Sequence, residues 1–222
     1  SDLTEKPVEG VNYDKLTAPD EDASVDLWFD HMTEKLYQTN TASSGLNTYV
    51  IHMAGNSIEN CQFFLAPKAD RSFTITLTDF ADGKGHTLKT QLLREHYASI
   101  LGNMIPDGLP PVDGAVSVKG GKSQGFVVKV WAETDQAAGL YSADLTVTDA
   151  ESGKTVKTAK VYVYVYPFSL SEETALRTAV NMGDWAIVST YQNRGMNDYE
   201  YWDLYKIYYD FLLENRICAY RL

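Results

Sequence analysis

The chain has 222 residues, of which 44% are hydrophobic and 12% aromatic, and these proportions indicate one large or two modest folded domains rather than a disordered chain. Its formal net charge of -11 argues against binding to nucleic acid, because neutralising phosphates requires clustered lysines and arginines. No apolar run of about 18 residues is present, so the sequence predicts no membrane-spanning helix.

The start of the chain is strongly acidic. Residues 1–30 contain nine acidic residues and two lysines. The acidic residues do not follow the spacing of a calcium-binding loop, so we expect residues 1–25 to form a solvated acidic arm rather than a cation site. Such a polar start would suit a tether behind a removed leader. We therefore expect an extracytoplasmic protein (secreted, periplasmic or surface-tethered), with an intracellular location as the alternative.

The cysteines and histidines give no sign of a disulfide or a metal. Cys61 and Cys218 fall in segments that we assign to different modules, so we expect no disulfide between them and expect both to be small buried residues. The four histidines lack the spacing of metal ligands, and no motif indicates another cofactor, so we expect neither. These histidines are His31, His52, His86 and His96.

Short segments of alternating apolar residues, typical of strands, follow the arm. Residues 26–40 are ambiguous between short strands and a helical turn, and we favour strands. Further strands are predicted at 49–53, 61–65 and 72–78. Residues 87–101 could form either a strand or a helix.

The next part of the chain continues the strand pattern. Residues 105–114 (IPDGLPPVDG) are predicted to be an irregular, proline-rich connection. Strands are predicted at 116–118, 126–132 and 140–148, and residues 149–153 turn the chain back. In the last of these strands the side chains expected on one side are Tyr141, Ala143, Leu145 and Val147.

The strongest strand pattern follows that turn, in residues 156–170 (VKTAKVYVYVYPFSL). Two sets of apolar side chains alternate there, Val161, Val163 and Val165 on one side and Tyr162, Tyr164 and Tyr166 on the other. Because both faces are apolar, we expect both to be covered. Pro167 cannot donate to a strand ladder, so we expect it to end the strand and to mark the border of a second module.

After Pro167 the spacing of the apolar residues changes from the strand pattern. A short strand is predicted at 177–182, residues 183–195 are a loop or a weak second element, and 217–222 begins another strand. Between them, 199–215 has the spacing of an amphipathic helix. Its stripe is Trp202, Tyr205, Tyr209, Leu212 and Leu213.

The start of that helix carries a capping signature. Asn197 is followed three residues later by Glu200, which is the pattern of a capping box.

Many short strands followed by one strand–helix–strand unit predict a mainly β chain. We expect an antiparallel β-sandwich over 26–167 and a short α/β segment over 168–222.

Several stretches carry a resemblance to a known family. They are AGNSIENCQFFL at 54–65, IPDGLPPVDG, AGLYSADLTV at 138–147, YPFSLSEETALRTAVNM at 166–182 and YYDFLLENRI at 208–217. In these stretches the chain resembles the glycoside hydrolase family 123-like proteins, including the DUF4091-type proteins related to them. The resemblance covers most of the chain.

This resemblance implies an N-terminal β-sandwich followed by a (β/α)₈ TIM barrel that hydrolyses glycosidic bonds. In characterised members of the family the substrate is a terminal β-linked N-acetylgalactosaminide. There the acetamido oxygen of the substrate attacks the anomeric carbon, one carboxylate orients that group, and an adjacent carboxylic acid protonates the leaving oxygen. The resemblance thus implies carbohydrate as the ligand of the barrel.

The chain is short for such a protein. A TIM barrel needs about 250 residues, whereas 55 follow Pro167, and the only adjacent acidic pair among them is Glu172–Glu173. We therefore expect a sandwich with the first βα unit of a truncated barrel, without catalytic residues and inactive by itself. Its incomplete barrel segment should fold back on the Tyr162, Tyr164 and Tyr166 face or associate with another copy of the chain.

Three residues are candidates for substrate binding. Asn181, Asp184 and Trp185 follow the first predicted barrel strand, and barrel enzymes bind substrates at the carboxyl ends of their strands. A tryptophan beside a carboxylate suits sugar stacking and hydroxyl contacts, although an ordinary structural loop is the alternative.

Two other functions are open. The chain could be a free-standing carbohydrate-binding or adhesin-like surface sandwich that uses exposed tryptophan and tyrosine. A third hypothesis is a purely structural module in a cell-surface assembly, without a ligand.

Overall fold

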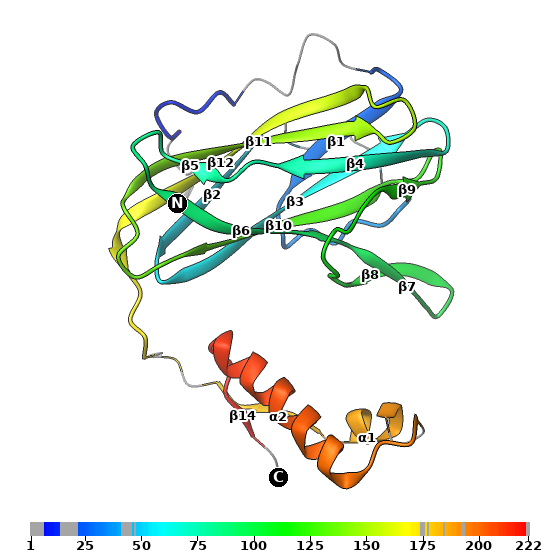
Figure 1. Cartoon of the computed structure of the whole chain (residues 1–222), viewed down its shortest axis with the longest axis vertical. Helices are drawn as coiled ribbons and strands as arrows, with labels where there is room; N and C mark the ends of the chain where they lie inside the picture. Colours follow the sequence, from blue (N-terminus) through cyan, green and yellow to red (C-terminus); the bar gives the residue numbers. More distant parts are fainter. Residues whose placement is uncertain are drawn as a thin grey trace, which may run out of the picture. The chain divides into compact units, whose positions relative to one another are not determined.

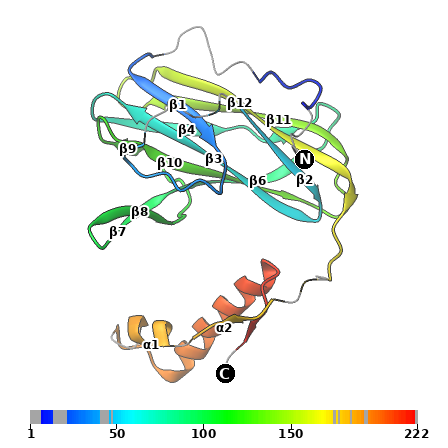
Figure 2. The ribbon, with the colours of Figure 1, turned by 180° about the vertical axis from the view of Figure 1, so that it is seen from behind.

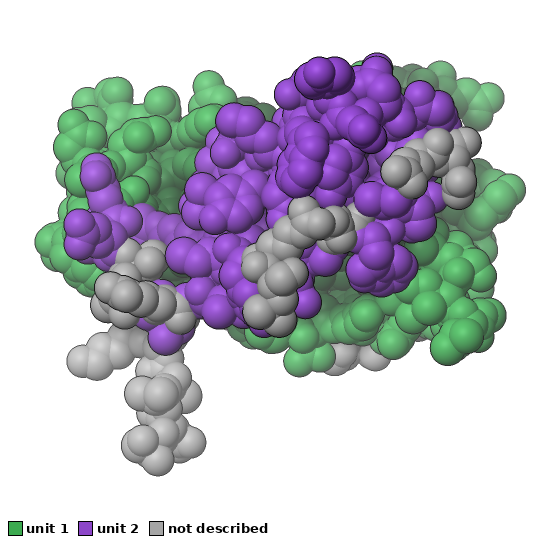
Figure 3. All heavy atoms as spheres, turned by 90° about the horizontal axis from the view of Figure 1, so that it is seen from below, with its two compact units in different colours: residues 1–170 green, residues 171–222 purple. Residues whose placement is uncertain are grey.

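The computed structural model of the chain (Figure 1) describes residues 7–13, 22–40, 46, 48–173, 176, 178–183, 185–191 and 194–220. The chain divides into two compact units, Ser1–Leu170 and Ser171–Leu222, which are coloured separately in Figure 3. Among the described residues, strands contain 50% and helices 12%. The predicted mainly β class with a short α/β segment at the end is confirmed.

The first unit contains a ten-stranded sheet that folds into two layers (Figures 1 and 2). One layer has the order β1-β3-β10-β6, and the other contains β5, β11, β12 and β2, with β4 pairing to β11 and β9 to β4. Pairing of β5 with β6 links the layers. The strands are β1 (Val25–Asp30), β2 (Tyr49–Gly55), β3 (Ser57–Pro67), β4 (Arg71–Leu77), β5 (Phe80–Ala81), β6 (Thr87–Arg94), β9 (Val116–Val118), β10 (Gln124–Ala132), β11 (Gly139–Asp149) and β12 (Thr155–Ser169).

The core lies between the two layers, where inward-facing side chains of both meet. From the first layer, the rings of Phe63 and Phe126 on neighbouring strands stack with centroids 5.1 Å apart. From the second layer, Tyr141, Ala143, Leu145 and Val147 are buried on one side of β11, which confirms the predicted alternation. Burial of this many large apolar side chains is the main source of stability for the sandwich.

Strand β12 has the two-sided character that its sequence predicts. Its valine side is fully buried in the core, at Val161, Val163 and Val165. On the other side Tyr162 is buried, while Tyr164 and Tyr166 are partly buried. Their rings meet edge-on at 5.4 Å, and His52 of β2 lies beside both of them.

The prediction that Pro167 ends this strand is wrong, because β12 continues to Ser169. The ladder with β11 ends at Val165, and the register with β2 shifts between Val165 and Ser169. Pro167 therefore lies where no ladder needs its N–H, which a proline lacks. The pairing of β12 with β2 is also parallel, an exception in an otherwise antiparallel sheet among the described strands.

Two other segments differ from their predictions. Residues 87–101, which were open between strand and helix, form β6 and then β7 (His96–Ile100), separated at Glu95. The first four residues of the connection at 105–114, expected to be irregular, lie in β8 (Asn103–Gly108), which pairs with β7 in a hairpin of its own (Figure 1). Of the ambiguous residues 26–40, the first part lies in β1 and the rest is not in a strand.

The second unit is a short α/β segment. Its elements are β13 (Val180–Asn181), α1 (Trp185–Tyr191), α2 (Asp198–Glu214) and β14 (Ala219–Tyr220). The two strands are parallel, and the helices between them form the crossover that parallel strands require. The long helix occurs as predicted, to within one residue at each end, and the segment 183–195 contains α1. The two predicted strands, at 177–182 and 217–222, occur only as two-residue strands within those ranges.

Helix α2 begins at the predicted capping box. The side chain of Asn197 accepts hydrogen bonds from the N–H groups of Tyr199 and Glu200, and the Glu200 carboxylate accepts one from the N–H of Asn197. The hydroxyl of Tyr209 donates to the carbonyl of Ala219 across a 3.5 Å distance, so the helix packs against β14.

The two cysteines differ from each other. Cys61 is fully buried, and burial raises the pKa of its thiol far above the usual range. Cys218, which was also expected to be buried, is exposed just before β14. The prediction fails there because the two-stranded sheet of the second unit is too small to bury the residues at its edges.

Candidate functional site

Asn181 and Trp185, two of the three residues predicted to bind substrate, lie at one edge of the second unit. Asn181 is the last residue of β13 and is exposed, with Tyr220 of β14 as its register partner. The N–H of Val180 donates to Cys218, and the N–H of Met182 donates to Tyr220. Because β13 and β14 are parallel, their carboxyl ends meet at this edge.

Trp185 opens helix α1 just beyond the end of β13, and its side chain is 74% exposed. Its indole folds back over Gly183, where an added Cβ would lie 3.0 Å from the indole Cδ1. The glycine thus makes room for the ring beside the strand end. Asp184, the third predicted residue, lies outside the described residues, so no ligand contact is assigned to it.

Sequence reasoning missed Tyr220, whose side chain is 40% exposed. The sequence alone does not show that Tyr220 lies beside Asn181, because this depends on the parallel pairing of β13 with β14. The predicted strand at 217–222 was the signal that could have identified it. The edge therefore presents an indole, a phenol and a carboxamide. Aromatic faces and amide groups of this kind can contact the C–H faces and hydroxyl groups of a sugar. The binding role of Asn181 and Trp185 stays a prediction.

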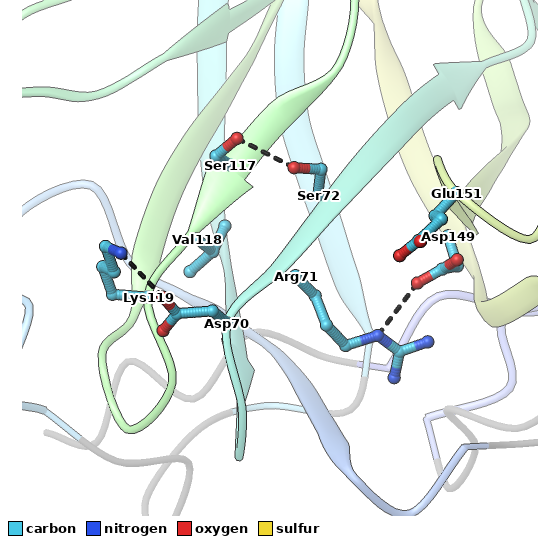
Figure 4. A pocket seen from close by; sticks show the side chains of 8 residues that line it. All are labelled: Asp70, Arg71, Ser72, Ser117, Val118, Lys119, Asp149 and Glu151. Carbon is cyan, nitrogen blue, oxygen red and sulfur yellow. Dashed lines mark hydrogen bonds and ion pairs between the residues drawn. The ribbon is translucent and has the colours of Figure 1, made fainter.

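A second candidate is a charged hollow of about 330 Å³ at one end of the sandwich (Figure 4). It lies where β4 begins, β9 ends and β11 turns into β12. In Figure 4 Arg71 points toward Asp149, and Lys119 points toward Asp70. The atoms joined are Arg71 Nε and Asp149 Oδ2 at 3.0 Å, and Lys119 Nζ and Asp70 Oδ2 at 2.6 Å.

The acidic partners in this hollow are held in their charged form. Hydrogen bonds from Ser152, and then from Arg71, lower the pKa of Asp149 to about 2. Asp22 also binds Arg71, at 2.6 Å, and hydrogen bonds from Ser24 and Arg71 hold its pKa well below the usual range.

Both cations of the hollow are therefore already paired with carboxylates. The network joins the end of the N-terminal segment, at Asp22, to β4 and to the β11–β12 turn. A site for an acidic ligand would need an unpaired cation, which this hollow does not offer. We assign it a structural role.

No group of three or more metal-ligating side chains that could hold a metal ion occurs among the residues that the structure describes. Within the same residues, no helix has both the length and the apolar character that crossing a bilayer requires.

The chain is similar in fold to a family 123 glycoside hydrolase from Clostridium perfringens, whose structure was analysed for glycolipid glycan hydrolysis. The TM-score is 0.60 at 15% identity, covering 76% of this chain and 32% of that chain. At that identity the likeness shows the fold alone. The chain thus spans about a third of the length of that enzyme.

Other similarities are weak. A FixG-related protein from Vibrio parahaemolyticus has a TM-score of 0.35 at 7% identity, over 64% of this chain and 96% of that chain. The N-terminal domain of PorA has a TM-score of 0.32 at 8% identity, over 65% of this chain and 100% of that chain. Neither carries an argument about function. No family model matches the chain, and no curated protein matches it, so the DUF4091-type subgroup stays a prediction.

Proposed function

We propose that the chain is the non-catalytic N-terminal region of a glycoside hydrolase that acts on glycans. The observation that carries this proposal is the likeness of its fold to a glycan hydrolase of which it covers 32%. In this proposal the sandwich, which runs from β1 to the end of β12 at Ser169, supports a barrel, and the second unit forms the first βα unit of that barrel. An acidic segment precedes β1, and the protein works outside the cytoplasm.

The second unit has the features expected of an isolated barrel segment. Two strands of two residues each form its sheet, and none of the 17 residues of α2 is buried. A helix of a complete barrel packs against the strands on one side and against neighbouring helices on both flanks. On α2 the large apolar side chains that are more than 40% exposed include Tyr199, Trp202, Ile207, Phe211 and Leu213.

The substrate in this proposal is a terminal β-linked N-acetylgalactosaminide, which follows from the family resemblance. The substrate's own acetamido oxygen would act as nucleophile, assisted by two adjacent carboxyl groups from a later barrel strand. The described part of this chain contributes no such pair. Asn181 and Trp185 would border the sugar at the carboxyl end of the first strand.

A comparison of two chains tests the proposal. The 222-residue chain and a chain extended by the coding sequence that follows Leu222 are incubated with aryl β-N-acetylgalactosaminide and aryl β-N-acetylglucosaminide. We expect hydrolysis by the extended chain alone. Hydrolysis by the 222-residue chain, or none by the extended chain on either substrate, would count against it.

The alternative of a free-standing carbohydrate-binding sandwich has one observation in its favour, the exposed aromatic edge formed by Trp185 and Tyr220. On a glycan array the 222-residue chain would then bind a defined sugar, and Trp185→Ala would abolish the signal. The main proposal expects no strong binding at this edge without the rest of the barrel.

A further inference from the structure

The outer face of the layer formed by β3, β10 and β6 carries two rows of side chains that the core does not use. Val128 and Val130 of β10 point into the core, so the residues that alternate with them point outward. The strand register sets three side chains in each row. The rows are Lys89–Trp131–Ile58 and Gln91–Lys129–Asn60, and we call these six residues the Trp131 grid.

The segment that follows β1 covers part of this sheet face, but it does not extend over the grid. The next row of the same register, Leu93–Val127–Gln62, is buried. The side-chain amide of Gln62 donates to the carbonyls of His31 and Glu34, so the segment after β1 lies over that row. In the grid, by contrast, Lys89 and Gln91 are exposed and the other four residues are partly exposed.

The grid concentrates positive charge on an aromatic ring. The Nζ atom of Lys89 lies 5.1 Å from the centroid of the Trp131 ring, and that of Lys129 lies 4.9 Å from it. Neither ammonium forms an ion pair with a carboxylate of the described residues. The grid holds no acidic residue, and the next one along β10 is Glu133, beyond the end of the strand.

This arrangement is unusual for a chain with a formal net charge of -11. Two ammonium groups beside one indole repel each other, and the ring offsets only part of that repulsion. An anion bound between or beside them would complete the charge balance. The amides of Asn60 and Gln91 add donors and acceptors, and the indole adds a flat apolar surface.

We propose that the Trp131 grid is a binding site for an anionic glycan, a polysaccharide that carries carboxylate or sulfate groups. Lys89 and Lys129 contact the anionic groups, Trp131 contacts the apolar face of a sugar ring, and the amides bond to hydroxyl groups. The two adjacent rows span three strands, which suits an extended chain rather than a single small molecule. The site lies on the sandwich and needs no barrel, so it goes beyond the proposed hydrolase role.

Binding of the 222-residue chain to immobilised polysaccharides tests this proposal. The probes are hyaluronan, which carries carboxylates only, dextran sulfate, which carries sulfates only, chondroitin sulfate, which carries both, and neutral dextran. We expect binding to at least one charged probe, weakening as salt rises, and none to neutral dextran. Failure to bind any charged probe at low salt would overturn the proposal, as would equally tight binding of single-stranded DNA.

Variants locate the binding on the grid. Lys89→Gln with Lys129→Gln should weaken binding about tenfold, because two charge-assisted contacts are lost. A matched control, Lys84→Gln with Lys154→Gln, removes two exposed ammonium groups elsewhere on the sandwich and should leave the affinity within about twofold. If both double variants weakened binding equally, the polysaccharide would be attracted by surface lysines in general, and the proposed site would be overturned.

A third variant separates recognition from packing. Trp131→Leu keeps both lysine charges and an apolar side chain at position 131, and it should still weaken binding severalfold. If the ring served only as packing beneath the two lysines, this variant would change the melting temperature and leave binding unchanged. The readout does not involve hydrolysis. Binding at the grid together with an inactive extended chain would refute the proposed hydrolase and support this inference. No binding at the grid together with an active extended chain would refute this inference and support the proposed hydrolase.

Discussion

At the scale of single residues, Glu95 is a carboxyl group that is buried without a cationic partner among the described residues. It separates β6 from β7, and the residue is 6% exposed. The hydroxyl of Tyr97 donates to its Oε2 atom at 2.8 Å. Burial is the main cause that raises the pKa of Glu95, and the Tyr97 hydrogen bond offsets part of that rise.

Replacing Glu95 by glutamine should therefore stabilise the sandwich at neutral pH. The raised pKa means that ionised Glu95 destabilises the folded state above its folded pKa, and that this cost disappears below the ordinary value of 4.5. We expect Glu95→Gln to raise the free energy of unfolding by about 1 kcal/mol at pH 8 and to change it little at pH 4. Urea unfolding at both pH values measures this, and an equal effect at the two would contradict it.

Gly125 makes the space that Glu95 occupies. A Cβ at this position would overlap the Glu95 carboxylate and lie 2.7 Å from the Phe64 ring. We expect Gly125→Ala to lower the free energy of unfolding by about 2 kcal/mol, since buried overpacking displaces both neighbours. Chemical unfolding is the measurement.

Gly108→Ala is the matched control for that substitution. Its Cβ would meet only the Cβ of His96, at an ordinary 3.8 Å, and Gly108 also lies in a strand. Alanine lowers the conformational entropy of the unfolded chain, so Gly108→Ala should leave the stability unchanged or raise it slightly. A loss as large at Gly108 as at Gly125 would mean that the space beneath Glu95 does not explain the result.

Residue-level prediction from the sequence worked where alternation decides the outcome. The inward side of β11 follows from the pattern of Tyr141 to Val147. Glu95 could not be found in this way, because it lies between two strands and its burial depends on Gly125, which is 30 positions away but adjacent in space. The candidate Asn181 followed from its place after a predicted strand, whereas Tyr220 required the parallel register.

At the scale of elements, the first turn of helix α2 depends on its capping box. The N–H groups of that turn have no partner within the helix, and the side chains of Asn197 and Glu200 bond to the start of the helix. Asn197→Ala should destabilise the helix by about 1 kcal/mol because two N–H groups lose their acceptor. Faster amide hydrogen exchange at the start of α2 measures this, and Glu200→Gln, which keeps an acceptor at that position, should show little change.

Element boundaries were harder to predict than element types. The strand through Pro167 was cut short in the prediction because the proline was assumed to lie in a ladder, while the register shift beside it removes that requirement. Residues 87–101 hide a break at Glu95 that no glycine or proline marks. The hairpin of β7 and β8 uses Pro106 in its strand, which is tolerated because β8 pairs on one side only among the described strands.

At the scale of the whole molecule, the exposed apolar side chains of α2 predict self-association. Ile207 is 64% exposed and Phe211 is 58% exposed. We expect the chain to gain mass with concentration in light scattering, and Ile207→Glu with Phe211→Glu to return it to a monomer. Thr74→Glu with Thr76→Glu, which adds the same charge on the exposed side of β4, should not. A wild-type monomer at all concentrations would contradict this prediction.

The parallel pairing of β2 with β12 sets the order in which the sandwich can form during synthesis on the ribosome. Tyr49 is paired with Val161, so the second layer stays open until more than a hundred further residues have emerged. Closing so long a loop is slow, and the edge of β2 is unprotected in the meantime. A nascent chain of this protein should therefore depend on chaperones until its last sandwich strand has left the exit tunnel.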